Sequence, residues 1–302
     1  MLSLLAASAS AADPIYWENL GLSPYLFKIG SFELRYYSLA YLIGVVFAYW
    51  HLSKMIKQPG APMAQRHADD LFFYCTLGVI LGGRLGYAAF YTGGDTGIPS
   101  AFTDFSGDGF ISWKLLRLWD GGMSFHGGVL GVLAAIGWIS WRNKLSFLRV
   151  ADYIAVNVPM GYMLGRLANF VNGELWGRAT DVSWGMVFPH GGNVVRHPSQ
   201  LYQAGIEGFV LLVIMMLLFW KTKARYRPGL MVGVFTVGMG AGRFINEFFR
   251  EPDAQLADFA VRTGLSMGQW LTIPLILTGL IVTFYAVMKK PVGAGASNPQ
   301  AA

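Results

Sequence analysis

The sequence predicts an all-α protein that crosses a membrane about seven times. The chain has 302 residues, of which 54% are hydrophobic and only 13% are charged, against roughly 25% charged residues in ordinary soluble domains. Apolar stretches near the length of about 20 residues that spans a bilayer as a helix recur along the chain. The predicted spans cover approximately residues 33–53, 71–91, 122–141, 151–171, 203–220, 229–249 and 270–288. We expect one membrane domain over residues 1–290.

The first three predicted spans carry polar residues within apolar sequence. The span 33–53 has Tyr37 near its start, and 71–91 holds Arg84 between Gly83 and Leu85. The span 122–141 opens on a glycine-rich motif that contains His126. Polar side chains of this kind are typical of spans that line an internal cavity, because the lipid itself cannot solvate them.

The last four predicted spans differ in polarity. The span 151–171 runs into the segment 165–174, which reads Gly-Arg-Leu-Ala-Asn-Phe-Val-Asn-Gly-Glu. The cleanest apolar run is in the span 203–220, which has no charged residue from Phe209 to Trp220. The sixth span contains Arg243, and the seventh is followed at once by two lysines.

The loop charges predict the orientation of the chain. Basic residues gather in alternate connections, and such connections are cytoplasmic by the positive-inside rule. These basic residues are Lys54, Lys57, Arg66, Arg142, Lys144, Arg149, Lys221, Lys223, Arg225, Arg227, Lys289 and Lys290. The N-terminus is then outside and the C-terminus cytoplasmic, with periplasmic loops at 92–121 and 172–202. The net charge of +6 therefore reflects membrane orientation, and we expect no nucleic-acid partner.

The two ends of the chain and the single cysteine carry little function. Cys75 is the only cysteine, so no intramolecular disulfide is possible, and we expect it to be an inert buried residue. Residues 1–12 faintly resemble a signal peptide but lack a basic start, and we do not predict one. The tail 291–302, rich in Pro, Gly, Ala and Ser, is predicted to be disordered.

Three arginines in apolar segments are the strongest functional signal. A charged group at membrane depth costs at least ~2.5–3.5 kcal/mol on insertion scales, and so marks a functional site. Arg84, Arg166 and Arg243 all lie in predicted spans. The guanidinium group presents a rigid fork of donors that suits phosphate. The sequence therefore predicts a membrane protein that handles an anion.

Two Arg-x-x-Asn pairs sharpen this prediction. Arg166 precedes Asn169 by three residues, and Arg243 precedes Asn246 likewise, a spacing that places each pair on one helix face. The predicted topology puts both pairs, together with Tyr37 and His126, in the outer half of the membrane. In the alternative reading, the arginines are neutralised by Glu174, Glu207 or Glu247 and merely tie helices together.

His126 and the tyrosines each allow two readings. His126 could act as a general base, because imidazole ordinarily titrates close to neutral pH, or it could be a packing residue bonded to a backbone carbonyl. The glycines beside it would allow close approach of either a ligand or a neighbouring helix. Tyr37 and Tyr87 could bind a ligand or belong to the aromatic belt of the membrane interface.

Five ordered motifs together resemble one known family. They are residues 82–87, 119–128, 165–178, 196–202 and 248–255. The chain resembles the bacterial phosphatidylglycerol–prolipoprotein diacylglyceryl transferase family. The resemblance implies a multi-pass inner-membrane transferase with its site toward the periplasm. Such an enzyme moves the diacylglyceryl group of phosphatidylglycerol to the lipobox cysteine of a prolipoprotein, as the first step of lipoprotein maturation. A thioether forms, and glycerol 1-phosphate leaves.

The resemblance also implies roles for individual residues. The family's essential arginines correspond to Arg166 and Arg243, its essential histidine to His126, and a functional tyrosine to Tyr37. Substrate-binding positions are expected at Tyr37, Arg84, Tyr87, Asn169, Glu174, Gly177, Arg196, His197, Asn246 and Glu247. Neither a metal nor a cofactor is expected, since phosphatidylglycerol is a substrate.

The chain departs from the family pattern in two places. Where a tyrosine is expected four residues before Arg243, the chain has Met239. A hydroxyl at that position is then either dispensable here or supplied from elsewhere. The segment between Gly177 and Arg196 is also shorter than the resemblance leads us to expect.

Two other classes of membrane protein also place polar residues within their spans. A transporter or flippase for an anionic lipid or another anion would also need buried arginines, but should offer polar groups at both membrane faces. An intramembrane protease would need paired aspartates or a Ser–His dyad within the spans. Asp152 has no aspartate partner in the spans, and Ser124 beside His126 is a weak dyad candidate.

Overall fold

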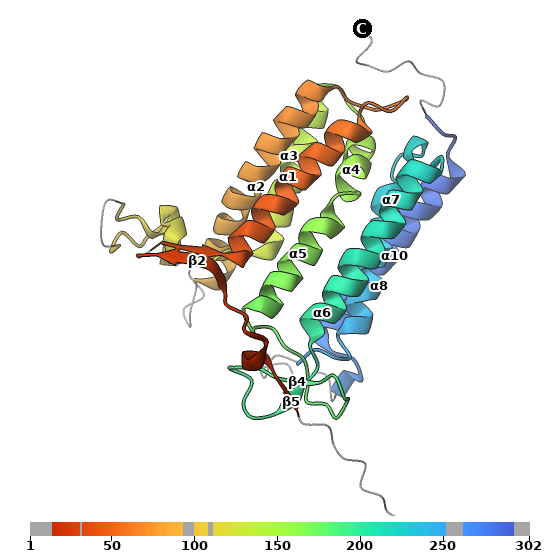
Figure 1. Ribbon diagram of the computed structural model, residues 1–302. Coiled ribbons are helices and arrows are strands. Elements are labelled where there is room, and N and C mark those ends of the chain that lie inside the picture. The colour runs from red at the N-terminus through yellow and green to blue at the C-terminus, as the bar shows by residue number, and fades with distance from the viewer. Residues whose placement is uncertain (1–13, 31, 93–99, 108–110, 252–261, 293–302) are drawn as a thin grey trace, which may run out of the picture. The chain divides into compact units, whose positions relative to one another are not determined.

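The computed structural model describes residues 14–30, 32–92, 100–107, 111–251 and 262–292, and within these ranges it is mostly helical (Figure 1). The helices are α1 (Tyr36–Met55), α2 (Gln65–Tyr91), α3 (Phe125–Arg142), α4 (Phe147–Ala155), α5 (Val158–Val171), α6 (Ser199–Gln203), α7 (Leu211–Lys221), α8 (Leu230–Asn246) and α10 (Met267–Met288). The prediction of a mostly helical chain is confirmed. Some predictions lie outside the described residues. They concern residues 1–12, most of the tail 291–302, and parts of the motif 248–255 and of the loop 92–121.

Several helices are long and apolar enough to cross a membrane. Within the described part of the chain these are Gln65–Tyr91, Ser199–Lys221 and Met267–Met288, and the shorter Leu230–Asn246 is also apolar. Each predicted span coincides with helical structure. These findings suggest a membrane protein, whereas the sevenfold crossing and its orientation stay predictions.

The predicted span 151–171 is not one helix. It consists of α4 and α5, separated by a turn at Val156 and Asn157. Pro159 lies in the first turn of α5. Proline has no N–H to donate to the preceding turn and its ring clashes with that turn, so a helix tends to restart at such a residue.

The predicted span 203–220 is also irregular. Between α6 and α7, residues Ala204–Val210 form a π-helical segment, η6, that contains Glu207. Such segments frequently occur at functional sites, because the extra residue per turn changes the direction of side chains.

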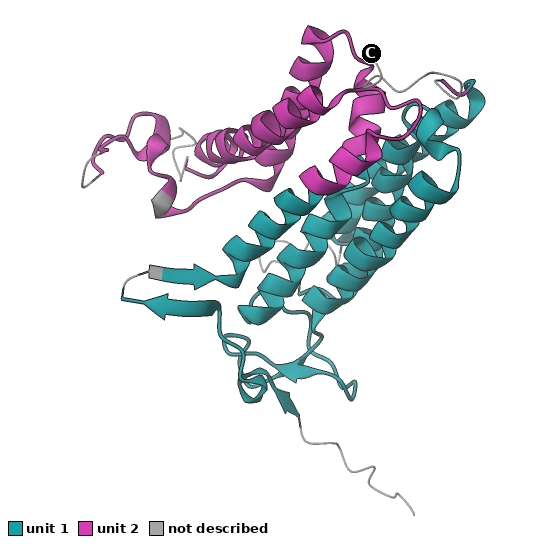
Figure 2. Ribbon diagram, turned by 45° about the horizontal axis from the view of Figure 1, so that its top comes forward, with its two compact units in different colours: residues 1–48, 155–290 teal, residues 49–154, 291–302 magenta. Residues whose placement is uncertain are grey.

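The helices divide into two compact units (Figure 2). The first, unit 1, contains residues 1–48 and 155–290, and the second, unit 2, contains residues 49–154 and 291–302. Helix α1 begins in unit 1 and ends in unit 2. The expectation of a single membrane domain stays a prediction.

In unit 1, helices α5, α6–α7, α8 and α10 lie side by side (Figure 1). Helices α8 and α10 pack closely through glycines. A Cβ on Gly233 would lie 2.7 Å from the backbone nitrogen of Thr283, and one on Gly279 would lie 2.8 Å from that of Val237. Small residues allow helices this approach where packing, rather than water exclusion, drives their association.

Unit 1 also contains short strands that the sequence analysis did not predict. Strand β1 (Ile15–Tyr16) pairs in parallel with β4 (Met186–Val187), which pairs antiparallel with β5 (Val195–Arg196). A separate hairpin joins β2 (Tyr25–Ile29) and β3 (Phe32–Arg35). Strands of two to five residues are too short to show a reliable two-residue periodicity.

In unit 2, α2 and α3 pack along a row of glycines. A Cβ on Gly86 would lie 2.8 Å from the Cα of Gly127, and one on Gly82 would lie 3.0 Å from the Cα of Gly131. Gly131 also packs directly on the backbone of Gly78. Gly127, beside His126, therefore serves helix packing.

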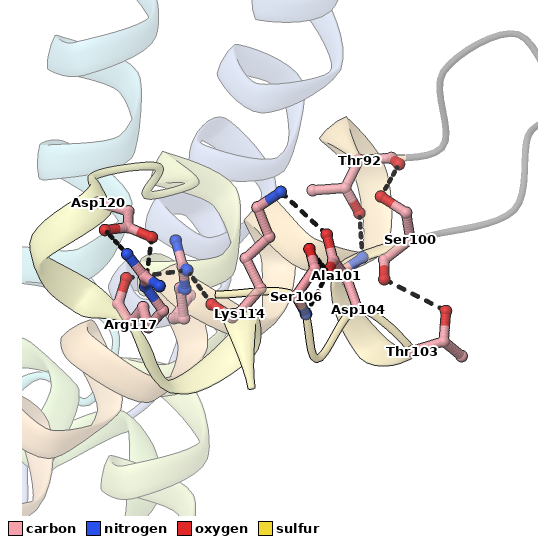
Figure 3. Close-up of polar contacts among 10 residues, drawn as sticks. Thr92, Ser100, Ala101, Thr103, Asp104, Ser106, Lys114, Arg117 and Asp120 are labelled. Carbon is pink, nitrogen blue, oxygen red and sulfur yellow. Dashed lines mark hydrogen bonds and ion pairs between the residues drawn. The ribbon is translucent and has the colours of Figure 1, made fainter. Parts of the chain in front are cut away.

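The connection between α2 and α3 is held by its own polar contacts (Figure 3). Asp104 accepts hydrogen bonds from the Ser106 hydroxyl and, at 2.9 Å, from Lys114 Nζ. These contacts, the Ser106 bond first, hold the pKa of Asp104 well below its usual range. Arg117 pairs with Asp120 at 2.7 Å. The connection also contains two single helical turns, Lys114–Leu116 and Leu118–Asp120.

Candidate active site

A buried carboxylate joins three spans of unit 1. Glu207, on η6, is only 1% exposed. Its Oε2 accepts a hydrogen bond from Tyr162 Oη of α5 at 2.6 Å. Its Oε1 accepts one from Asn246 Nδ2 of α8 at 2.7 Å. Both carboxylate oxygens are thus engaged by donors from different helices.

The two predicted catalytic arginines lie on the two helices that donate to this carboxylate, Arg166 on α5 and Arg243 on α8. The guanidinium of Arg166 lies over the Tyr162 ring, with its Cζ 4.9 Å from the ring centroid. Both Arg166 and Arg243 lie close enough to Glu207 for their charges to act on its carboxylate. The structure therefore brings together the two arginine helices that the Arg-x-x-Asn spacing singled out.

Arg166 and Arg243 differ in their partners. Arg166 Nη1 donates to Asn169 Oδ1 at 3.4 Å, so this pair shares a helix face as predicted. Within the described residues, no carboxylate oxygen lies within ion-pair distance of Arg166. Arg243 Nη2 lies 3.4 Å from Glu247 Oε2. The reading in which a glutamate neutralises the arginine fits Arg243 better than Arg166.

Glu247 lies in a confined position. Its side chain is 5% exposed, and its Oε1 is 3.8 Å from Arg250 Nη1. A Cβ on Gly268, in the first turn of α10, would lie 2.7 Å from the Glu247 carboxylate. The carboxylate thus sits near a helix N-terminus, where the helix dipole favours negative charge.

The end of α5 carries a second polar cluster. Glu174 Oε1 accepts from Asn169 Nδ2 at 2.9 Å and from Asn172 Nδ2 at 3.1 Å. The charges of Glu174 and Arg166 act on the hydroxyl of Tyr37, which also lies 3.4 Å from the Tyr41 hydroxyl. Unit 1 therefore gathers Tyr37, Asn169 and Glu174 near Arg166.

Arg196 is engaged by residues of the loop between α5 and α6 and by Glu251. Its guanidinium stacks on Trp176, with 4.1 Å between Cζ and the ring centroid. Arg196 Nε donates to the Gly191 carbonyl at 2.9 Å, and Nη1 pairs with Glu251 at 3.0 Å. Through these contacts Arg196 holds the loop together. Substrate binding by Arg196 stays a prediction.

Gly177 and His197 lie where two loop segments meet. Gly177 N donates to the His197 carbonyl at 2.8 Å, and a Cβ on Gly177 would lie 2.8 Å from His197 Cβ. His197 Nδ1 is 3.1 Å from the Tyr202 hydroxyl. Partial burial lowers the pKa of His197, and the Asp181 carboxylate opposes that shift. Only glycine fits at 177 without moving this neighbour.

In unit 2, Arg84 is committed to backbone carbonyls. It is 6% exposed. Its guanidinium donates to the carbonyl oxygens of Lys114 at 2.5 Å, Leu115 at 2.9 Å, Arg117 at 3.0 Å, Gly122 at 3.2 Å, and also Gly121. Since a guanidinium has five N–H donors, these contacts fix the loop before α3. Substrate binding by Arg84 stays a prediction, and its contacts are those of a loop anchor.

Tyr87 packs beside this anchor. Its ring centroid is 5.7 Å from Arg84 Cζ, and it stacks on Tyr91 at 5.9 Å. A Cβ on Gly122 would overlap the Tyr87 ring. Gly122 has a positive φ of 81°, so glycine is required there for both reasons.

His126 is exposed in the first turn of α3. Its ring makes an edge-to-face contact with Phe125, with 5.6 Å between centroids. No hydrogen bond from this imidazole to a backbone carbonyl is found in the part of the chain that the structure describes. Ser124 caps α3 by accepting from Gly127 N at 3.3 Å. Among the described residues no hydrogen bond links the Ser124 hydroxyl to His126, so the structure gives a Ser–His dyad no support.

Comparison with known proteins identifies the family. The sequence model of the prolipoprotein diacylglyceryl transferase family matches residues 24–285. A phosphatidylglycerol–prolipoprotein diacylglyceryl transferase of Erythrobacter litoralis is 61% identical over 285 residues, covering 94% of this chain and 96% of the relative. The corresponding proteins of Zymomonas mobilis and Rhodospirillum rubrum are 46% identical over 275 residues and 44% over 274 residues. These matches cover 88% and 89% of this chain, and 91% and 94% of the relatives.

The chain belongs to the prolipoprotein diacylglyceryl transferase family. The predicted resemblance is therefore confirmed. All five motifs that carried the resemblance fall within the matched residues. Met239, where a tyrosine was expected, lies half-buried on α8.

Two residues of this family member's polar cluster were not among the predicted site residues. Tyr162 was not singled out at all, and Glu207 was considered only as a partner for an arginine. Glu207 lies in a strongly apolar predicted span, and an ionisable residue there is a functional signal on its own. Tyr162 gives no such signal, since tyrosines are common in membrane helices.

Proposed function

We propose that this protein transfers the diacylglyceryl group of phosphatidylglycerol to the thiol of a prolipoprotein cysteine. Its products are a diacylglyceryl thioether and glycerol 1-phosphate. The names of the relatives give the donor and the acceptor class. The observation that carries the proposal is that the helices of Arg166 and Arg243 are joined at one buried carboxylate, that of Glu207, through hydrogen bonds from Tyr162 and Asn246. The acceptor cysteine is proposed to be that of a lipobox in the signal peptide.

The nucleophile is the substrate's own thiol, so the enzyme needs no reactive cysteine. A free thiol has a pKa near ~8.5, and only the thiolate attacks. We propose that His126 takes the thiol proton. The sulfur then forms a bond to the glyceryl carbon that bears the phosphate ester. The bond between that carbon and the ester oxygen breaks, and the electron pair leaves with the phosphate.

The arginines act on the leaving group. Negative charge grows on the departing phosphate, and guanidinium donors aimed at it stabilise the transition state more than the ground state. Removing one preorganised donor of this kind costs about 2.7–4 kcal/mol elsewhere. Since arginine charge can serve this need, we propose that transfer requires neither a metal nor a cofactor.

The membrane arrangement is part of the proposal. The chain crosses the bacterial inner membrane seven times, with its N-terminus outside and its C-terminus in the cytoplasm. The site opens toward the periplasm, where exported prolipoproteins present their signal peptides. The alternation of basic connections along the sequence supports this orientation.

No contact among the described residues favours the alternative of a transporter or flippase for an anionic lipid. The deciding experiment incubates the purified protein with phosphatidylglycerol vesicles and a synthetic lipobox peptide, followed by mass spectrometry of the peptide. Gain of one diacylglyceryl group is expected. An unchanged peptide would overturn the proposal, and a cleaved peptide would indicate a protease instead.

A further inference from the structure

Glu207 is a buried titratable group with no part in the chemical steps above. Its carboxylate lies in an apolar span, where an unpaired charge is strongly unfavourable. Both oxygens are paired, one with Tyr162 Oη at 2.6 Å and the other with Asn246 Nδ2 at 2.7 Å. The donors belong to α5 and α8, so this one side chain connects both helices that carry the arginines.

Glycines let the three segments close around this side chain. A Cβ on Gly242 of α8 would lie 2.6 Å from Glu207 Cγ. A Cβ on Gly208, the next residue of η6, would lie 2.6 Å from Met163 Cβ of α5. Larger residues at either position would push α8 or α5 away from η6. The close packing of η6 on α5 and α8 therefore occurs at the same place as the two hydrogen bonds of Glu207.

The partners of Glu207 lead directly to the arginines. Tyr162 supplies the ring over which the Arg166 guanidinium lies, at 4.9 Å. Asn246 follows Arg243 by three residues, which is about one helical turn. A shift of either partner would therefore move a guanidinium relative to the phosphate that it must stabilise.

We infer that Glu207 is a positioning residue that holds the helices of Arg166 and Arg243 in register through its two hydrogen bonds. This inference rests on the proposed function. It assigns Glu207 a role through its partners rather than on the substrate. Catalysis by fixed donors is sensitive to such placement, because a displacement of 1 Å can cost about 10²-fold in rate.

The test compares substitutions that keep or remove the hydrogen bonds. In Glu207→Gln, the amide oxygen still accepts from Asn246, and the amide nitrogen can donate to the Tyr162 hydroxyl oxygen. We expect kcat for lipid transfer to stay within about threefold of wild type, since both contacts survive. Glu207→Leu keeps the volume without the bonds, and should lower kcat by at least about tenfold through misplacement of the arginines.

A second pair of variants shows whether Tyr162 and Glu207 act together. Tyr162→Phe keeps the ring beneath Arg166 and should lower kcat about tenfold by leaving a carboxylate oxygen unpaired. Combining it with Glu207→Leu should add no further loss, because residues that act through one shared bond are not additive. Thr236→Val serves as a control, since that hydroxyl bonds the carbonyl of Val232 in its own helix at 2.8 Å, and it should keep full activity.

The outcomes separate this inference from the proposed function. If the wild-type protein makes no lipid adduct, the proposed function itself fails. With an active wild type, full activity of Glu207→Leu or Tyr162→Phe would overturn the positioning role. Glu207→Gln as damaging as Glu207→Leu would also overturn it, because charge rather than hydrogen bonding would then be required. Thermal unfolding of each purified variant checks that it is folded. If Glu207→Leu is not folded, the activity of Tyr162→Phe decides whether the positioning role holds.

Discussion

Arg166 is a charged residue on the apolar helix α5, and its guanidinium can still bind an anion. It lies over Tyr162, donates to Asn169, and has no ion-pair partner among the described residues. Arg243, in contrast, shares its charge with Glu247. At the residue scale, Arg166 is therefore the better candidate for direct contact with the substrate phosphate. The side chain of Arg243 is instead held in place by its ion pair with Glu247.

Replacement of either arginine should abolish lipid transfer. Arg166→Ala and Arg243→Ala should each lower kcat by at least about 10²-fold, the loss typical of a missing preorganised donor. Arg166→Lys should fail as well, because an ammonium group cannot reproduce the two-pronged contact of a guanidinium. Adduct formation on a lipobox peptide measures the loss. Arg142→Ala, at an exposed arginine in a basic connection, is the matched control. Near-normal transfer by either alanine variant would refute the assignment.

His126 should reveal its role through pH. If it removes the thiol proton, His126→Gln should lose most activity near neutral pH. The loss should be partly rescued above the thiol pKa near ~8.5, where the substrate ionises without help. A pH–rate profile of the variant on a lipobox peptide measures this. A flat profile without rescue would rule out the base and leave the field of the arginines as the thiol activator.

At the scale of elements, the glycine row between α2 and α3 should tolerate no side chain. In Gly131→Ala the new Cβ would overlap the backbone of Gly78, and overpacking of this kind costs about 1–3 kcal/mol. Gly137, on the same helix, has open space around its Cβ position, so Gly137→Ala should be neutral or stabilising by up to ~1 kcal/mol. Thermal unfolding in detergent compares the two. Equal melting temperatures would show that the glycine contact is unimportant.

The elements also show what the sequence could and could not predict. The apolar helices could be located from the sequence because the length of an apolar stretch matches the thickness of the bilayer core. The sequence did not predict the break before Pro159 or the π-helical segment around Glu207. Hydropathy carries no information about the pattern of backbone hydrogen bonds. The motifs predicted Arg166, Asn169 and Arg243 as site residues. The shared hydrogen bonding of Tyr162 and Asn246 to Glu207 was not predictable, since it depends on how α5, η6 and α8 pack.

At the scale of the whole molecule, the predicted orientation is open to a labelling test. In a Cys75→Ser background, Thr103→Cys and Asn193→Cys place thiols at exposed positions of the two predicted periplasmic loops. Both should react with an impermeant maleimide applied from the periplasmic side. Pro59→Cys, exposed in a predicted cytoplasmic connection, should react only after the membrane is disrupted. The reverse pattern would contradict both the topology and a periplasmic site.

The central claim is that the whole diacylglyceryl group moves to sulfur while the phosphate leaves with the head-group glycerol. The most direct measurement uses phosphatidylglycerol carrying one isotopic label in its acyl chains and another in its head-group glycerol. Mass spectrometry then follows both labels after incubation with the protein and a lipobox peptide. The acyl label is expected on the peptide cysteine, and the head-group label in released glycerol 1-phosphate. A peptide that carries the head-group label, a single acyl chain or no label at all would contradict it.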